Sequence, residues 1–354
     1  MASDNQVGQY YEISLEGLAA DNDSHVTVSL DVGSGLQNLV VYHKDALLTT
    51  DTSADEYFTY SGSTLTLYVK SFSPFSVIYD APTWQELADF SWYDADKSEF
   101  EINTAEQLAG VAYLVNVEKN NLSGKTITLG SDIDLAGHVW TPIGNLVSYP
   151  GISFQGTFDG DNHTISNMNV IDTTVNYAVA AFFGSTAGDA VIKDVTFENS
   201  NVTSSHYAAV VLAYEASNKH KTSIQNVTVD GATIVSSAEL LDGGYDNGDK
   251  VGGIVGYATS TTVSGCKVKD ATIKGYRDIG GIFGCGDGAW VGPTGTSGCE
   301  VSNVTLIIDN AHNYKNYSSL GEHNVNAFIG RLINEPVSDN NTSSNVKIID
   351  PYTT

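Results

Sequence analysis

One short phrase recurs through the C-terminal half of the chain and strongly constrains its fold. The phrase runs apolar, polar, Asn or Asp or Gly, apolar in most copies, which begin at residues 165, 192, 224, 263, 301 and 343. A second phrase, rich in glycine and alanine, lies between successive copies and is clearest at 252–256 (GGIVG) and 280–284 (GGIFG). Recurrence at intervals of tens of residues indicates a stack of similar structural units.

The pattern around each copy is that of a β-helix coil. Apolar and polar residues alternate after each bend, as in Val195 and Phe197 or Val227 and Val229. Such alternation buries one face of a strand, and stacked units close a continuous core that no unit has alone. Residues that tolerate left-handed backbone angles are expected to form one bend column, whose stacked amides can hydrogen-bond to one another. We assign to this column Asn167, Asp194, Asn226, Gly265, Asn303 and Asn345.

The alternation of the two phrases resembles the GLUG-motif repeat of bacterial surface proteins. The preceding stretch, 100–170, is similar to the lead-in found before such repeats in surface proteins of gut bacteria, with INTAEQL at 102–108, WTPIG at 140–144 and FQGTFDG at 154–160. The resemblance covers residues 98–350. It implies a right-handed parallel β-helix and an adhesin role, and it implies no catalytic residues because structural repeats define the family.

The sequence therefore predicts an all-β protein of two domains. Residues 1–80 have short alternating strands separated by Gly, Asp and Ser clusters, which predicts an immunoglobulin-like β-sandwich module. Residues 81–97 are expected to be a linker, and residues 98–354 a parallel β-helix of about seven coils. A capping box at Thr104–Gln107 and an apolar face of Leu108, Val111, Ala112 and Val115 predict a helix over 104–117 that covers the first coil.

Composition excludes several classes of partner. The chain has 16 Lys and Arg against 42 Asp and Glu, a net charge of −26, so it lacks the basic surface that nucleic acids require. Only 16% of residues are charged, and polar uncharged residues dominate, which is typical of secreted all-β proteins. No apolar run is long enough to span a membrane. We expect a secreted or bacterial cell-surface protein that is a monomer and does not insert into membranes.

Unequal connections between the coils indicate where a ligand would bind. Long insertions at 236–250 and 312–324 would gather on one side of the stack, and repeat proteins often bind ligands on such a side. Tyrosine offers a flat apolar face and a hydroxyl, which suits sugar rings. The alternative is that these tyrosines only shield the loop bases. The candidate ligand-binding residues are Tyr245, Tyr276, Arg277, Trp290, Tyr314 and Tyr317.

Two further features have a chemical and a plain interpretation. Asp242, Asp246 and Asp249 lie on a glycine-rich loop and could supply oxygen ligands to calcium, although their spacing fits no established calcium motif. The plain alternative is a solvated acidic loop, and no other cofactor is expected. Cys285 and Cys299 bracket another glycine-rich loop, which a disulfide would close in an oxidising compartment. The alternative is that both cysteines remain as free thiols.

An enzyme on a β-helix is the main competing hypothesis. Glu198 and Asp230 occupy equivalent outward positions of adjacent coils, and a retaining glycosidase needs carboxyl groups about 5–5.5 Å apart. Lys269 continues this column, however, and outward charges are normally just solvated. We therefore predict a non-catalytic adhesin that binds a glycan or a surface protein of a host or bacterium. The alternatives are a polysaccharide lyase or glycoside hydrolase and, second, a structural stalk.

Overall fold

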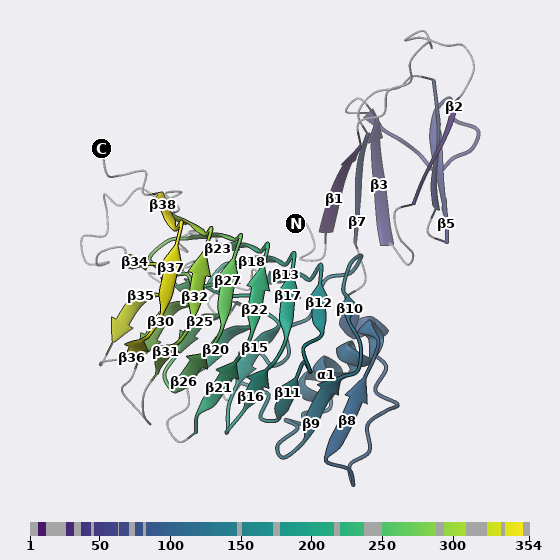
Figure 1. The fold of residues 1–354 in the computed structure, drawn as a ribbon. Helices are drawn as coiled ribbons and strands as arrows, with labels where there is room; N and C mark the ends of the chain where they lie inside the picture. The colour runs from purple at the N-terminus through teal and green to yellow at the C-terminus, as the bar shows by residue number, and fades with distance from the viewer. Residues whose placement is uncertain are drawn as a thin grey trace. The chain divides into compact units, whose positions relative to one another are not determined.

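The computed structural model describes residues 6–11, 26–31, 37–43, 46–62, 64–70, 75–80, 83–146, 151–172, 178–215, 220–236, 250–287, 294–308, 324–333 and 337–349. These residues form two compact units, one made mainly of residues up to 83 and the other mainly of residues from 84 onward. Strands dominate both units (Figure 1).

The N-terminal unit is a β-sandwich of two antiparallel sheets, as predicted. One sheet has the order β1 (Gln6–Tyr11), β7 (Phe75–Asp80), β3 (Gln37–His43), β4 (Ala46–Leu47). The other has the order β2 (Val26–Asp31), β6 (Thr64–Val69), β5 (Tyr57–Ser61). Buried side chains from both sheets share one core, with Val41, Phe75 and Val77 from the first and Phe58, Leu65, Leu67 and Val69 from the second.

The second unit is a parallel β-helix, which confirms the predicted fold class. A complete coil passes through five parallel sheets in a fixed order, which we number 1 to 5 along the chain (Figure 1). The described strands β8 to β10 belong to sheets 1 and 2 only, and β36 to β38 belong to sheets 1 to 3. Sheet 1 consists of β8 (Glu99–Ile102), β9 (Thr126–Leu129), β11 (Thr157–Asp159), β16 (Val191–Lys193), β21 (Thr222–Gln225), β26 (Thr261–Ser264), β31 (Gly295–Ser297) and β36 (Val337–Asp339). Sheet 2 consists of β10 (Ile133–Asp134), β12 (Thr164–Ser166), β17 (Thr196–Glu198), β22 (Thr228–Asp230), β27 (Lys267–Lys269), β32 (Glu300–Ser302) and β37 (Thr342–Ser344).

The other three sheets complete each coil. Sheet 3 consists of β13 (Asn169–Asp172), β18 (Asn201–Ser204), β23 (Thr233–Ser236), β28 (Thr272–Gly275), β33 (Thr305–Ile308) and β38 (Lys347–Ile349). Sheet 4 consists of β14 (Val179–Ala180), β19 (Tyr207–Ala208), β24 (Lys250–Gly252), β29 (Asp278–Gly280) and β34 (Asn324–Asn326). Sheet 5 consists of β15 (Phe183–Thr186), β20 (Leu212–Glu215), β25 (Val255–Ala258), β30 (Phe283–Asp287) and β35 (Ile329–Ile333).

The bends form two columns, and the single column that we predicted is therefore wrong. Ile165 pairs with Phe197 in sheet 2, while Ile192 pairs with Ile224 in sheet 1, so these copies of the phrase belong to different sheets. The column between sheets 1 and 2 is Asp194, Asn226, Gly265, Gly298 and Asn340. The column between sheets 2 and 3 is Asn167, Asn199, Gly231, Asp270, Asn303 and Asn345. All have φ between 50° and 70°, and the same backbone demand makes both bends look alike in sequence.

Side-chain amides and carboxylates link the bends from coil to coil, as predicted. Asn226 Nδ2 donates to Asp194 Oδ1 at 2.9 Å in the first column. In the second, Asn303 Nδ2 donates to Asp270 Oδ1 at 3.0 Å, and Asn345 Nδ2 donates to Asn303 Oδ1 at 2.8 Å. These bonds tie adjacent coils together at the points where the main chain leaves one sheet for the next.

Helix α1 (Ala105–Asn116) lies beside β8 and β9 at the start of the β-helix (Figure 1). Thr104 is its N-cap and accepts a hydrogen bond from Gln107 N at 3.3 Å. The predicted apolar face is buried, with Leu108, Val111 and Val115 fully enclosed in the core of the β-helix. The helix thus covers the apolar interior of the first coil.

The segment 84–97, which we expected to be a linker, instead belongs to the second unit. It begins with the 3₁₀ turn η1 (Trp84–Leu87). Trp84 is buried in the β-helix core, and its Nε1 donates to Leu135 O at 3.0 Å. Trp92 and Tyr93 pack against the same core, because large aromatic side chains gain more from burial than from exposure to water.

The glycine-rich second phrase forms the tight corner between sheets 4 and 5. A Cβ atom on Gly280 would overlap the carbonyl oxygen of Phe283 and lie 2.7 Å from Gly330 N. The backbone of one coil therefore lies against the next at this corner, with no room for a side chain.

We predict that Gly280→Ala lowers the free energy of unfolding by roughly 3 kcal/mol or more, because its Cβ meets backbone atoms that cannot move away. Gly124→Ala is the matched control, since Gly124 has φ +71° and no atom lies within 4 Å of the position that its Cβ would take. Its cost should stay near the conformational penalty of about 1–2 kcal/mol. Equal losses for the two variants in urea melts would contradict the close packing of this corner.

Candidate functional site

Polar and aromatic side chains form one strip across sheets 4 and 5, in which Ser185, Asp278 and Cys285 are buried and the other members are half-buried. Their strands are in register, so equivalent positions of successive coils lie next to one another. The column in sheet 4 is Tyr207, Lys250, Asp278 and Asn324. The column in sheet 5 is Ser185, Tyr214, Tyr257, Cys285 and Arg331. We call these nine residues the sheet 4–5 strip.

Three half-buried tyrosines form the aromatic part of the strip. The rings of Tyr214 and Tyr257 stack with centroids 5.5 Å apart and an angle of 26° between their planes. The ring centroids of Tyr207 and Tyr214 are 5.0 Å apart. Lys250 Nζ lies 5.3 Å from the ring centroid of Tyr207 and 5.7 Å from that of Tyr257. An ammonium group over aromatic faces is attracted by the ring quadrupole. This arrangement offers flat apolar faces, hydroxyl groups and a positive charge on neighbouring coils.

The charged part of the strip is organised around Asp278, whose side chain is fully buried. Asn324 Nδ2 donates to Asp278 Oδ1 at 2.9 Å. Arg277 Nε and Arg331 Nη1 each lie 3.9 Å from Asp278 Oδ2. Arg277 and Arg331 are the two arginines of the whole sequence. Both are therefore placed at the same carboxylate, in the two coils that follow the coil of Tyr257.

Burial affects the ionisation of the central tyrosine. It raises the pKa of the Tyr257 phenol above its usual range, and the nearby Asp287 carboxylate adds to the shift because it repels a phenolate. The phenol therefore stays neutral in the folded protein and can donate a hydrogen bond to a ligand.

The structure corrects one predicted ligand contact and shows where another residue lies. Tyr276 is only 2% exposed, so its ring is not available to a ligand as we had predicted. It lies between β28 and β29, where the connection is too short to lift the side chain away from the stack. Arg277 borders the strip through Asp278. Outside the described residues lie Tyr245, Trp290, Tyr314 and Tyr317, together with the proposed calcium ligands Asp242, Asp246 and Asp249.

The predicted disulfide between Cys285 and Cys299 is not formed in the structure. Cys285 lies on β30, in the sheet 5 column of the strip. Cys299 follows the bend at Gly298 and belongs to the hydrophobic core. The two side chains therefore lie on opposite sides of the sheets, which sequence spacing alone does not reveal.

Sequence reasoning missed Tyr214, Tyr257 and Arg331. A usable signal was present, since each follows the last small residue of the second phrase: Ala213, Gly256 and Gly330. Alignment of the coils on that phrase, rather than on loop length, would have placed the three side chains in one column.

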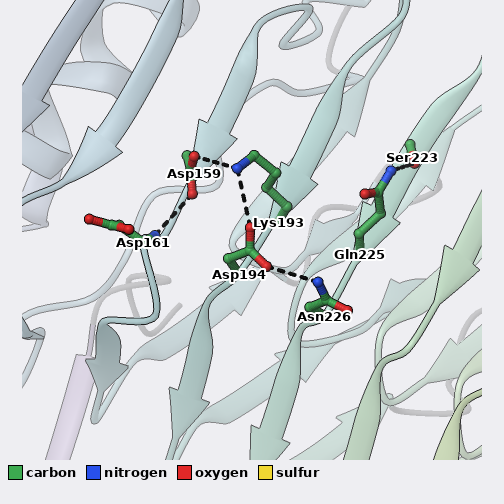
Figure 2. Close-up of polar contacts among 7 residues, drawn as sticks. All are labelled: Asp159, Asp161, Lys193, Asp194, Ser223, Gln225 and Asn226. Atoms are coloured by element: carbon green, nitrogen blue, oxygen red, sulfur yellow. Dashed lines mark hydrogen bonds and ion pairs between the residues drawn. The ribbon is translucent and has the colours of Figure 1, made fainter.

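The outward carboxylates of sheet 1 are engaged by a lysine. Lys193 Nζ contacts the carboxylates of Asp159 and Asp194, and Asn226 also donates to Asp194 (Figure 2). The hydrogen bond with Asp159 raises the pKa of Lys193. Asp159 Oδ1 also accepts from the backbone N of Asp161 at 3.0 Å, which closes the local turn. These groups stabilise one another within the sheet.

One carboxylate of the pair in sheet 2, that of Asp230, is engaged by a lysine in the same way. The strand register places Glu198 beside Asp230 and Asp230 beside Lys269, so the three do occupy equivalent positions, as predicted. Lys269 Nζ lies 2.6 Å from Asp230 Oδ2. Among the described residues, no group of three or more His, Cys, Asp or Glu side chains is placed to hold a metal ion.

No family model matches the chain. A stretch of 141 residues is 28% identical to halomucin of Haloquadratum walsbyi (strain DSM 16790 / HBSQ001), which covers 38% of this chain and 1% of halomucin. The chain therefore corresponds to a very small part of that relative. No helix in the described part of the chain is long and apolar enough to span a membrane.

A solved structure is also similar in its backbone. It is that of a candidate immunoglobulin A1 protease from Bacteroides ovatus, with a TM-score of 0.42 and 16% sequence identity. The match covers 72% of this chain and 78% of that one. At this TM-score the likeness carries no argument about function.

We predict that Asp278→Ala lowers the free energy of unfolding by about 3 kcal/mol, because it removes a buried carboxylate from between two guanidinium groups. Arg331→Ala is the comparison, because its side chain is 43% exposed and its ion pair is screened by water. That variant should lose less than about 1 kcal/mol. Urea melts in which both variants lose the same small amount would contradict a structural role for Asp278.

The raised pKa of Tyr257 predicts a loss of stability at alkaline pH. The unfolded chain releases the phenol proton above about pH 10, whereas the folded protein retains it, so unfolding becomes easier as the pH rises. Tyr257→Phe has no proton to release and should lose less stability than the wild type between about pH 10 and 12. Parallel pH profiles of the urea midpoint for the two proteins would show that Tyr257 ionises normally.

Proposed function

We propose that this chain is a non-catalytic part of an extracellular surface protein and that its sheet 4–5 strip binds a glycan. The stacked pair Tyr214 and Tyr257, with Lys250 beside it, is the observation that carries the proposal. Tyrosine faces suit the apolar faces of sugar rings, and phenol and ammonium groups can bond to sugar hydroxyls. Because the same strip positions repeat from coil to coil, a linear glycan lying along the stack would meet a series of contacts.

Local charge supports a ligand that carries hydroxyl or carboxylate groups. The chain as a whole has a net charge of −26, yet Lys250 and both arginines lie at this strip. Asp278 offsets part of their charge and fixes their positions. Preorganised donors lower the cost of ordering side chains when a ligand binds.

Two strip residues follow, along the chain, the long connections singled out in the sequence. Residues 237–249 and 309–323 join sheet 3 to sheet 4, and they end where β24 and β34 begin with strip residues Lys250 and Asn324. The low content of charged residues, 16%, and the similarity to halomucin support a place outside the cell, at the surface. Membership of the GLUG-motif repeat family stays a prediction, and so does a protein ligand in place of a glycan.

The test is binding of the full chain to an array of host and microbial glycans, with released sugar assayed in the same wells. We expect retention without product, and each of Tyr214→Ala and Tyr257→Ala should weaken binding by about tenfold. The matched control is the variant Tyr57→Ala, Tyr68→Ala, which removes another stacked tyrosine pair, with centroids 4.3 Å apart, from the N-terminal unit. This control should bind like the wild type.

Three outcomes would contradict the proposal. Sugar release would favour the polysaccharide lyase or glycoside hydrolase. Retention that is unchanged in Tyr214→Ala and Tyr257→Ala would place the binding surface elsewhere. No retention of any glycan would favour a protein ligand or a structural stalk.

A further inference from the structure

Two of the three cysteines occupy the same inward position of neighbouring coils. Cys266 follows the bend at Gly265, and Cys299 follows the equivalent bend at Gly298, with φ of 63° and 60°. The flanking strands are in register on both sides, since Ser264 pairs with Ser297 and Lys267 pairs with Glu300. Backbone hydrogen bonds fix the two bends against each other, with Glu300 N donating to Cys266 O at 2.9 Å.

The spacing of neighbouring coils suits a disulfide. Adjacent strands of a sheet lie about 4.8 Å apart, and disulfides join Cα atoms about 4.4–6.8 Å apart. Cys266 and Cys299 are 0% and 1% exposed, so both side chains are enclosed in the same narrow part of the core. Val227 N donates to Cys266 Sγ at 3.3 Å, and Cys299 Sγ donates to Val263 O at 3.5 Å, so each sulfur contacts the coil before its own.

The same column shows that packing alone does not require cysteine. The two preceding coils have Val195 and Val227 at this position, and both are buried. The following coil has Asn341, whose Oδ1 accepts from Cys299 N at 2.9 Å and whose Nδ2 donates to Thr296 Oγ1 at 2.8 Å. Asn341 thus closes over the cysteine pair on its C-terminal side.

We propose that Cys266 and Cys299 form a disulfide between neighbouring coils when the protein folds in the presence of a disulfide oxidant such as oxidised glutathione. The thiolate of Cys299 attacks the oxidant and forms a mixed disulfide, releasing one thiol. Cys266 then loses its proton and attacks the Cys299 sulfur, forming the Cys266–Cys299 bond and releasing the second thiol. Both cysteines are oxidised, and one oxidant disulfide is reduced to two thiols.

The environment of each sulfur indicates which thiol attacks the oxidant and which attacks the mixed disulfide. The hydrogen bond from Cys266 lowers the pKa of the Cys299 thiol, which favours the thiolate that attacks first. Burial raises the pKa of the Cys266 thiol, which keeps it protonated until the second step. Cys299 is 1% exposed and is bonded to Asn341, so we expect oxidation to occur during folding, before the coil of Asn341 has packed over Cys299.

The bond would tie two neighbouring coils covalently, at bends that otherwise hold together by hydrogen bonds such as that from Glu300 N to Cys266 O. Stacked coils open locally, in units smaller than the whole domain. A covalent link between two of them limits how far such opening spreads.

Peptide mapping of the oxidised protein tests the proposal. The full chain is refolded with oxidised and reduced glutathione, its remaining thiols are alkylated, and it is cleaved after Lys and Arg. Cys266 then lies in peptide 251–267, while Cys285 and Cys299 both lie in peptide 278–315. We expect these two peptides to be joined in the wild type and equally in Cys285→Ser, where only Cys266 and Cys299 remain.

The control variants are Cys299→Ser, which should lose the cross-link, and Cys266→Val, which restores the residue type of the preceding coils. The oxidised wild type should unfold at a temperature several degrees above its reduced form, and Cys266→Val should show no such difference. The proposal is overturned by a refolded Cys285→Ser protein with two alkylated thiols. A disulfide confined to peptide 278–315 would overturn it as well.

Discussion

The second unit depends on residues that can bend left-handed at the same place in every coil. Each bend turns the chain from one parallel sheet into the next, and a bend shifted by one residue would expose the apolar rows. Asn, Asp and Gly satisfy the positive φ, and the Asn and Asp side chains then bond to the coil before them, as in Asn226 with Asp194 and Asn303 with Asp270. The residues that permit the bend therefore also hold the register.

This register explains why one side of the stack differs from the others. In sheets 1 and 2, outward charges neutralise one another, as Lys193 does with Asp159 and Lys269 with Asp230. At the corner of sheets 4 and 5, small residues such as Gly280 let the backbones approach closely. Larger residues on the outer face, Tyr214 and Tyr257 among them, then stack on one another across the coils. The strip is a consequence of tight packing beneath it.

The features that local chemistry determines could be predicted from the sequence. Alternation of apolar residues indicated the parallel coils, and Thr104 with Gln107 indicated the start of α1. The two bend columns were confused because Asn167 and Asp194 meet the same backbone demand and are flanked by the same pattern. The partners of Asp278 could not be predicted in this way, since Arg331 is brought to it only by the coil-to-coil register of sheets 4 and 5. The disulfide prediction failed similarly, because Cys285 and Cys299 are near in sequence but lie on opposite sides of the sheets.

Hydrogen exchange of the full chain, with and without the glycan retained most strongly on the array, tests the central claim most directly. We expect the glycan to slow exchange in strands β19, β20, β24, β25, β29 and β30, which carry six of the nine strip residues. Exchange in the N-terminal unit and in the strands of sheets 1 and 2 should stay unchanged. Protection concentrated in sheets 1 and 2 or in the N-terminal unit, with exchange in sheets 4 and 5 unchanged, would contradict binding at the strip.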